Sequence, residues 1–154
     1  MIETVIEDEG WAAVLPEAEA LAEACRRAAA ALEPALEAEM ALLLCDDAAM
    51  TGLNTRFRGK TGPTNVLSFP SGEDKGFLGD IALARETCER EAAQKLIPLR
   101  DHAAHLIIHG MLHLIGYDHE TDDEAAMMER RETEILAAMG IADPYAASGG
   151  DADD

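Results

Sequence analysis

Hydrophobic and polar positions recur with two different periods along this chain, and the changes of period predict its strands and helices. Short apolar or alternating runs predict four strands, over residues 2–8, 39–45, 65–69 and 76–84. Helical spacing of the apolar residues predicts helices over residues 16–32, 47–57, 85–96, 99–115 and 120–139. The run 39–45 also fits a turn of helix, but its shortness and the Asp46–Asp47 pair after it favour a strand that leads into a helix N-cap.

Turn and cap residues support these boundaries. Pro16 marks the start of the first helix, Pro34 ends that region, and Gly140 ends the last helix. The strands at 65–69 and 76–84 lie close enough in sequence to form a hairpin. The order strand, helix, strand, helix, strand, strand and then helices predicts an α+β fold, in which helices cover a four-stranded mixed sheet.

Length and composition fit one domain, which we assign to residues 1–145 of the 154. The small, acidic segment 146–154 is expected to be a disordered tail. The cysteines are odd in number and form no CxxC pair, which favours buried free thiols in a reducing compartment: Cys25, Cys45 and Cys88. No apolar run approaches membrane-spanning length, and the acidic N-terminus lacks the basic region of a secretion signal. We therefore expect a cytoplasmic protein with no membrane partner.

The net charge of −19 argues, taken as a whole, against binding to nucleic acid. The distribution of charge changes that picture. From Ala48 to Gly72 there is no acidic residue, while Arg56, Arg58 and Lys60 all fall there. Charge alone leaves two interpretations open, an anion-binding loop or a solvated turn beside a neutral strand.

The strongest chemical signal is the spacing of three histidines near the end of the predicted helix 99–115. His109 and His113 are four residues apart and so share one helix face. Gly116 allows a sharp turn, which can bring His119 back as a third ligand. Three imidazoles around one metal ion leave a coordination position open, which is typical of catalytic rather than structural zinc. We therefore predict one Zn²⁺ per chain.

This spacing is that of the extended zinc-protease motif H-E-x-x-H-x-x-G-x-x-H, except that Gly110 stands where the protease carries its general-base Glu. Peptide hydrolysis by the usual route is therefore disfavoured. The helix around the motif is apolar on nearly every side, which predicts a buried, metal-bearing helix. The alternative is that each histidine only hydrogen-bonds inside the core, but three at this spacing favour the metal.

Neighbouring polar residues are candidates for a supporting shell around the metal. His105 lies one turn before His109, where it would support the ligands rather than join them, and His102 is interpreted as an ordinary core or surface histidine. Asp118 stands beside His119 and either accepts an imidazole N–H or only shapes the turn.

Three neutral ligands leave the metal its full positive charge, which suits a phosphodiester substrate. Such a substrate also needs a cation on the opposite side of the site. Arg58 is the best candidate, because a guanidinium group binds phosphate through two parallel hydrogen bonds. The alternative is that Arg58 is an exposed surface charge.

Three blocks of sequence resemble the YbeY family of bacterial metal-dependent endoribonucleases. The blocks are Leu53–Lys60 with Thr64–Pro70, Leu78–Ile81 and His109–His119, in the family's order. The resemblance covers roughly residues 40–135, while Thr61 stands where the family usually has an acidic residue, and the acidic tail lies outside the pattern.

The resemblance implies maturation of ribosomal RNA and ribosome quality control. It implies that His109, His113 and His119 are the zinc ligands, that Arg58 is the functional arginine, and that Asp80 lies under the site in a structural or catalytic role. It also implies help from a small-subunit ribosomal protein and a ribosome-assembly GTPase, because so acidic a chain should bind RNA weakly.

Our hypothesis at this level is that single-stranded RNA lies between the metal helix and the loop carrying Arg56 and Lys60, which bind substrate. The metal and Arg58 would stabilise charge on the scissile phosphate, and either water or the ribose 2′-hydroxyl would attack. Two alternatives remain: a zinc hydrolase of another substrate, such as a peptide, and a non-catalytic ribosome assembly factor.

Overall fold

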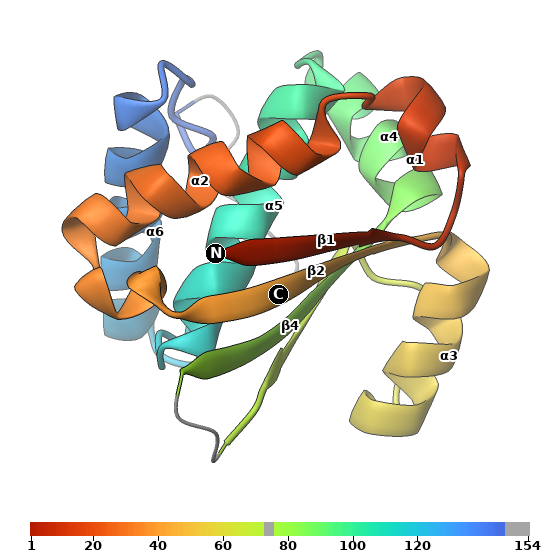
Figure 1. The fold of residues 1–154 in the computed structure, drawn as a ribbon, viewed down its shortest axis with the longest axis horizontal. Helices are drawn as coiled ribbons and strands as arrows, with labels where there is room; N and C mark the ends of the chain where they lie inside the picture. Colours follow the sequence, from red (N-terminus) through yellow and green to blue (C-terminus); the bar gives the residue numbers. More distant parts are fainter. Residues whose placement is uncertain (73–75, 147–154) are drawn as a thin grey trace.

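A computed structural model describes residues 1–72 and 76–146 of the chain. Its strands are β1 (Ile2–Ile6), β2 (Glu39–Cys45), β3 (Val66–Pro70) and β4 (Phe77–Ala84) (Figure 1). The α-helices are α1 (Gly10–Val14), α2 (Ala18–Leu32), α3 (Asp47–Arg58), α4 (Arg85–Lys95), α5 (Leu99–Leu114) and α6 (Asp122–Ala138), and η1 (Pro34–Glu37) is a short 3₁₀ helix.

The strands form one mixed sheet in the order β1-β2-β4-β3. β1, β2 and β4 run parallel, and β3 pairs antiparallel with β4 as the predicted hairpin. Its register places Val66 opposite Leu83 and Phe69 opposite Asp80. β3 is therefore an edge strand, and the predicted α+β fold with a four-stranded mixed sheet is confirmed.

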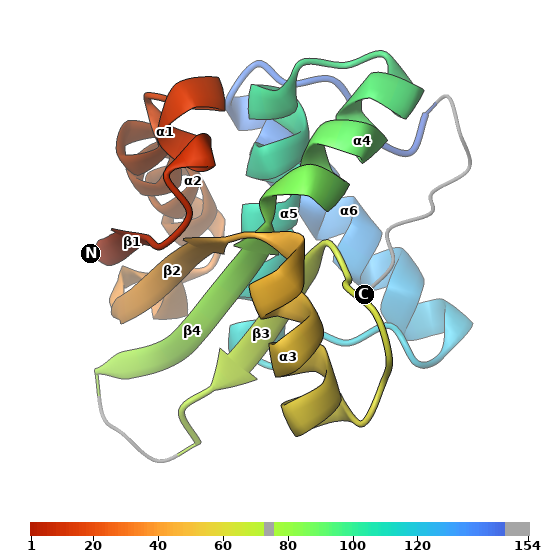
Figure 2. The ribbon, with the colours of Figure 1, turned by 90° about the vertical axis from the view of Figure 1, so that its right-hand side faces the viewer.

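The two faces of the sheet carry cores of different size, because side chains alternate between the faces of a strand. Ile81 and Leu83 of β4 face the larger core, which α2, α5 and α6 complete. Ala82 and Ala84 face a smaller core, which Met50 of α3 completes. Figure 2 shows α3 in front of the sheet, with α5 and α6 behind it.

Helix α5 is the centre of the larger core, and twelve of its sixteen residues are buried. It packs against β3 and β4 on one side and against α2, α4 and α6 on the others. A helix with neighbours all round has to be apolar all round, as the sequence of α5 is. The prediction of a buried helix is thus confirmed.

Two short helices were not predicted, because elements of one or two turns carry too few residues to show a period. α1 is held by Trp11, which is fully buried and whose indole N–H donates to the Cys45 carbonyl at 2.8 Å. η1 follows α2 directly. The predicted helix start at Pro16 is two residues early, since α2 begins at Ala18.

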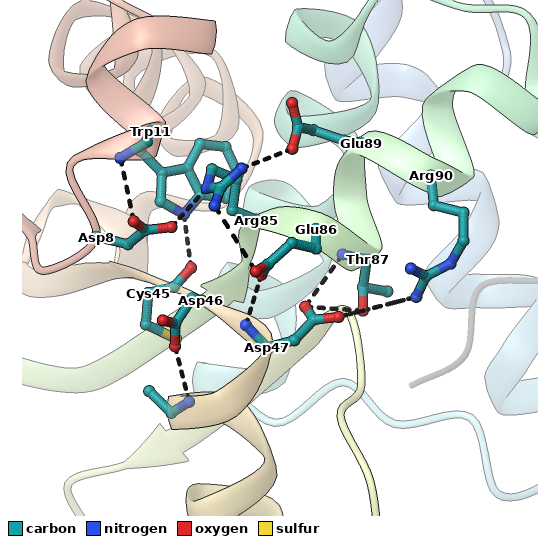
Figure 3. Close-up of polar contacts among 12 residues, drawn as sticks. Asp8, Trp11, Cys45, Asp46, Asp47, Arg85, Glu86, Thr87, Glu89 and Arg90 are labelled. Carbon is teal, nitrogen blue, oxygen red and sulfur yellow. Dashed lines mark hydrogen bonds and ion pairs between the residues drawn. The ribbon is translucent and has the colours of Figure 1, made fainter.

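Polar side chains join the carboxyl ends of the parallel strands (Figure 3). Arg85, which follows β4, donates from Nε to Asp8 Oδ2 at 2.5 Å, and Asp8 follows β1. Asp47, which follows β2, accepts from the Thr87 backbone and hydroxyl at 3.1 and 3.0 Å. These contacts fix the loops at the end of the sheet where α3 and α4 begin. All three cysteines are free and buried, as expected.

Residues 147–154, which make up nearly all of the predicted disordered tail, lie outside the described residues. Within residues 1–72 and 76–146, no helix combines the length and the apolar character needed to cross a bilayer.

Candidate metal centre and cleft

Local structure at the end of α5 brings the histidine motif together. His109 and His113 lie one turn apart on the last two turns of the helix. Gly116 follows with φ +105°, a backbone conformation that side-chain-bearing residues rarely adopt, so the glycine permits the turn. The loop ends at Thr121, which caps α6 in a reciprocal capping box with Glu124. His119 is therefore held in a short loop between two well-defined helix ends.

The three imidazoles converge. One ligand-capable atom from each of His109, His113 and His119 lies within 4.8 Å of the other two. The Nε2 atoms of His109 and His113 are 3.2 Å apart. The ring centroids lie 4.7 Å (109–113), 5.0 Å (113–119) and 5.5 Å (109–119) apart. His109 is buried, His113 is half-buried and His119 is exposed, so the group opens to solvent on one side.

In His109 and in His113, a hydrogen bond at Nδ1 determines which ring nitrogen is left to converge with the other histidines. His109 Nδ1 lies 2.6 Å from Glu132 Oε2, and His113 Nδ1 lies 2.9 Å from the Tyr117 carbonyl oxygen. A carboxylate and a carbonyl can only accept, so each Nδ1 carries the proton. Each Nε2 then keeps its lone pair for a metal ion. This donor set fits a divalent ion such as zinc, with three nitrogen ligands and an open side.

A cleft of about 370 Å³ lies beside the histidines. It is lined by Arg58, Val66, Ser68, Pro70, His109, His113, Gly116, Tyr117, Asp118, His119 and Glu120. Arg58 is the last residue of α3, where Gly59 ends the helix in the left-handed conformation. The cleft that the histidines line thus also carries a guanidinium group, which is suited to an anionic ligand.

The other two cations of the basic stretch do not line this cleft. Arg56 and Lys60 are both exposed. The Arg56 guanidinium lies 5.7 Å from the centroid of the Phe57 ring. Phe57 is 57% exposed, and it meets Phe69 edge to face with the centroids 5.3 Å apart. The structure therefore brings Arg58 to the histidines, with Arg56 and Lys60 further out on the same segment.

The residues proposed as a supporting shell occupy three different positions. Asp80 is exposed and is not at the cleft, because its neighbours Gly79 and Ile81 point to the α5 face and the alternation of β4 turns Asp80 to the other face. Partial loss of contact with water raises the pKa of the Asp80 carboxyl group. Asp118 lines the cleft, but its carboxylate accepts from the His119 backbone N–H at 2.8 Å rather than from an imidazole. His105 contacts Glu132, which in turn contacts His109, and the rings of His105 and His109 meet edge to face with their centroids 6.4 Å apart.

One residue that connects these side chains was not among those predicted from the sequence. Glu132 of α6 is fully buried and contacts His105, His109 and Tyr145. Burial raises the pKa of Glu132, but hydrogen bonds from His105 and His109 outweigh it and lower the pKa to about 2. The pKa of Tyr145 is raised by burial and by this carboxylate. One signal was present: Glu132 stands on the apolar stripe of α6, among Met128, Ile135 and Leu136.

Comparisons with known proteins identify the family to which the chain is similar. The family model described as endoribonuclease YbeY matches residues 6–140. A protein of that name from Maricaulis maris is 46% identical over 145 residues, which cover 94% of this chain and 91% of its own length. Its namesake from Sphingopyxis alaskensis is 51% identical over 148 residues, 88% of each chain. A protein from Thermotoga maritima, whose structure was solved in solution, has a TM-score of 0.59 at 25% identity, covering 99% of this chain and 97% of that one.

The matched residues contain every element that forms the cleft, from α3 through β3 and α5 to His119. Because the family model spans most of the chain, and relatives about half identical align over most of its length, this chain belongs to the endoribonuclease YbeY family.

Proposed function

We propose that this protein is a zinc-dependent endoribonuclease that cleaves single-stranded RNA during ribosomal RNA maturation and ribosome quality control. One observation carries the proposal: the converging nitrogens of His109, His113 and His119 and the side chain of Arg58 line a single cleft. A phosphodiester placed there would meet positive charge from the bound metal ion and from Arg58. The names of the relatives, endoribonuclease YbeY, support RNA as the substrate.

His109, His113 and His119 would hold the metal ion, one per chain. When bound, a zinc ion coordinated by neutral imidazoles supplies Lewis acidity toward a phosphoryl oxygen and lowers the pKa of water to about 7. Arg58 would bind the non-bridging phosphate oxygens through two N–H donors and stabilise the negative charge that grows on them during attack. Arg58 is therefore our proposed catalytic residue.

A single strand fits this surface better than a duplex. Phe57 is the most exposed of the chain's six aromatic side chains and adjoins Arg58. Exposed aromatic rings bind unstacked bases, which a single strand offers and a duplex hides. Arg56 and Lys60 flank this ring on the same segment and would bind the neighbouring phosphates. Asp118 and Glu120 line the same cleft, so RNA affinity should be modest and should fall with salt.

The acidity of the whole chain affects how the protein reaches its RNA substrate. At a net charge of −19, long-range attraction to RNA is absent. We propose that a small-subunit ribosomal protein and a ribosome-assembly GTPase deliver it to its substrate in the cytoplasm. We also propose that residues 1–145 act as a single domain, with the acidic tail outside it.

The peptidase alternative is weaker, for a steric reason. A Cβ on Gly110 would lie 2.8 Å from Ile81 Cγ2, so a glutamate could occupy that position only if the Ile81 side chain or the helix shifted. The test is a panel of substrates given to the zinc-loaded protein: a short unstructured RNA, the same RNA annealed to its complement, and a peptide library. We expect internal cleavage of the single strand, less of the duplex and none of the peptides. Peptide cleavage without RNA cleavage would favour the peptidase, and zinc binding with no cleavage would favour an assembly factor.

A further inference from the structure

Glu132 is the one buried carboxylate among residues 1–72 and 76–146. An ionised carboxylate inside a protein is stabilised only if its oxygens receive hydrogen bonds or face positive charge. The side chain comes from the middle of α6, a helix with many other acids, all of which reach solvent at least in part. Its burial therefore needs a reason beyond the amphipathic pattern of the helix.

Three donors surround this carboxylate. Oε2 accepts from His109 Nδ1 at 2.6 Å. Oε1 accepts from His105 Nε2 at 2.9 Å and from the Tyr145 hydroxyl. The hydroxyl also lies 3.1 Å from His105 Nε2, so Glu132, His105 and Tyr145 form one closed cluster. A carboxylate held by two further donors cannot rotate to follow His109, and it can therefore impose one orientation on that ring.

The contact with His109 is on the edge of the ring that faces away from His113 and His119. Proton donation from Nδ1 leaves Nε2 as the lone-pair nitrogen, and Nε2 is the atom that lies 3.2 Å from His113 Nε2. The same hydrogen bond fixes the side-chain torsion angles of His109 and so the orientation of its ring. The tautomer and the orientation that the metal needs are thus both present before any metal binds.

We propose that Glu132 is the positioning residue of the metal centre, with His105 and Tyr145 holding its carboxylate in place. This inference rests on the proposed metal-binding function and specifies how affinity for the ion is built. It predicts that loss of Glu132 weakens metal binding by more than the loss of a comparable buried hydrogen bond elsewhere on α5.

The chain provides that comparable bond. Glu91 of α4 accepts from His102 Nε2 at 2.8 Å, and His102 is as buried as His109, two turns earlier on the same helix. His102 is not among the converging histidines. Glu91→Gln therefore alters a carboxylate–imidazole contact of the same kind, 2.8 Å long against 2.6 Å at Glu132, without touching the ligands. It is the matched control for Glu132→Gln.

The experiment measures Zn²⁺ affinity of metal-free protein by competition with a chromogenic chelator, together with the melting temperature of each apo form. We expect Glu132→Gln to raise the dissociation constant about 10- to 100-fold. Glu132→Asp, which withdraws the carboxylate by one methylene, should give a loss in the same direction. Glu91→Gln should lower the melting temperature and leave zinc affinity at the wild-type value. If the wild-type protein itself binds no zinc, the proposed metal-dependent function fails, and this inference fails with it.

Equal zinc affinity in wild type and Glu132→Gln, or an equal loss in Glu91→Gln, would overturn the assignment. A second measurement needs no variant at position 132. Nitrogen-15 imidazole spectra of apo wild type, assigned by comparison with His109→Gln, should show His109 protonated at Nδ1. Protonation of His109 at Nε2 would contradict the proposal even if the Glu132 variants did not fold.

Discussion

Ile81 and Gly110 approach each other so closely that no side chain fits between β4 and α5 at this point. An ideal Cβ on Gly110 would lie 2.8 Å from Ile81 Cγ2 and 3.1 Å from the Ser68 hydroxyl. That hydroxyl donates to the Gly110 carbonyl at 3.2 Å. The glycine inside the histidine motif thus lets the metal-bearing helix rest directly on the sheet, which sets the height of His109 and His113 above the edge strand β3.

Replacing Gly110 by Ala should therefore destabilise the protein although alanine is the better helix former. Overpacking of this kind costs about 1–3 kcal/mol, against a gain of up to about 1 kcal/mol from helix propensity. We expect a melting temperature several degrees below wild type, measured on metal-free protein by circular dichroism.

Gly52→Ala is the matched control, because Gly52 is an exposed glycine inside α3 with nothing within 4 Å of its would-be Cβ. There the helix propensity acts alone, and about 0.5–1 kcal/mol of stabilisation is expected. If both substitutions stabilised the protein, the close contact between α5 and the sheet would not exist as described.

Zinc should stabilise the native state of wild type and leave His113→Ala unaffected. An ion that binds only the folded state adds about 2.7 kcal/mol at one hundred times its dissociation constant. We expect the melting temperature of apo wild type to rise on addition of zinc and to return on chelation. An equal rise in His113→Ala would remove His113 from the ligand set.

Arg58→Glu should abolish most RNA cleavage while zinc content stays at the wild-type level. Loss of one charge-stabilising donor typically lowers kcat by about 10²- to 10³-fold, and the introduced carboxylate also repels the phosphate. The control is Arg27→Glu, which makes the same change at an exposed arginine of α2, away from the cleft. Equal cleavage by Arg58→Glu and wild type would show that Arg58 has no catalytic role.

Phe57→Ala should weaken binding of single-stranded RNA and leave zinc affinity unchanged. A base stacked on an aromatic ring contributes about 1–3 kcal/mol, so we expect KM to rise roughly tenfold with a smaller change in kcat. Phe57→Trp should retain the wild-type KM because it keeps a stacking face. The idea fails if an RNA with abasic sites is cleaved with the same KM as the intact strand.

The Asp8–Arg85 pair should give the protein a pH-dependent term in its stability. Hydrogen bonds from the Arg85 side chain and the Gly10 backbone lower the pKa of Asp8 below its usual value near 3.8. A group with a lowered folded-state pKa stabilises the protein above its unfolded pKa, and the stabilisation is lost as pH falls through the folded value. Asp8→Asn should therefore lower the urea midpoint at pH 7, with the difference from wild type narrowing below about pH 4.

The matched control for Asp8→Asn is Glu9→Gln. It removes an equal charge from the exposed residue next to Asp8 in the sequence. Its urea midpoint should follow wild type at every pH. A constant difference between Asp8→Asn and wild type down to pH 3 would contradict the ion-pair explanation.

Sequence patterns predicted the sheet and the long helices because each spans enough residues to repeat its period. The buried strand 39–45 and the apolar helix around His109 are examples. The five-residue helix α1 was not predicted because contacts distant in sequence hold it, above all the hydrogen bond from the Trp11 indole to the Cys45 carbonyl. Strand order could not be predicted either, since β2 pairs with β4 although α3 and β3 lie between them in the sequence.

Part of the candidate site could likewise be predicted from the sequence, and part could not. His109, His113 and His119 could be predicted because helix geometry and one glycine connect them within eleven residues. Glu132 lies 23 residues from the ring it contacts, and only its position on the apolar stripe of α6 distinguishes it from the other acids of that helix. The position of Asp80 outside the lining of the cleft could not be predicted, because the face to which a strand residue points depends on a register that sequence alone does not give.

The most direct test of the central claim, that three histidines hold the ion on which RNA cleavage depends, is a zinc titration followed by two readouts on one sample. Apo wild type and apo His113→Ala would receive increasing zinc, and bound metal and cleavage of a single-stranded RNA would be measured at each point. We predict that cleavage by wild type rises in parallel with occupancy of one site per chain and that His113→Ala gains neither. Full cleavage by metal-free wild type, or by His113→Ala with no metal bound, would contradict the account.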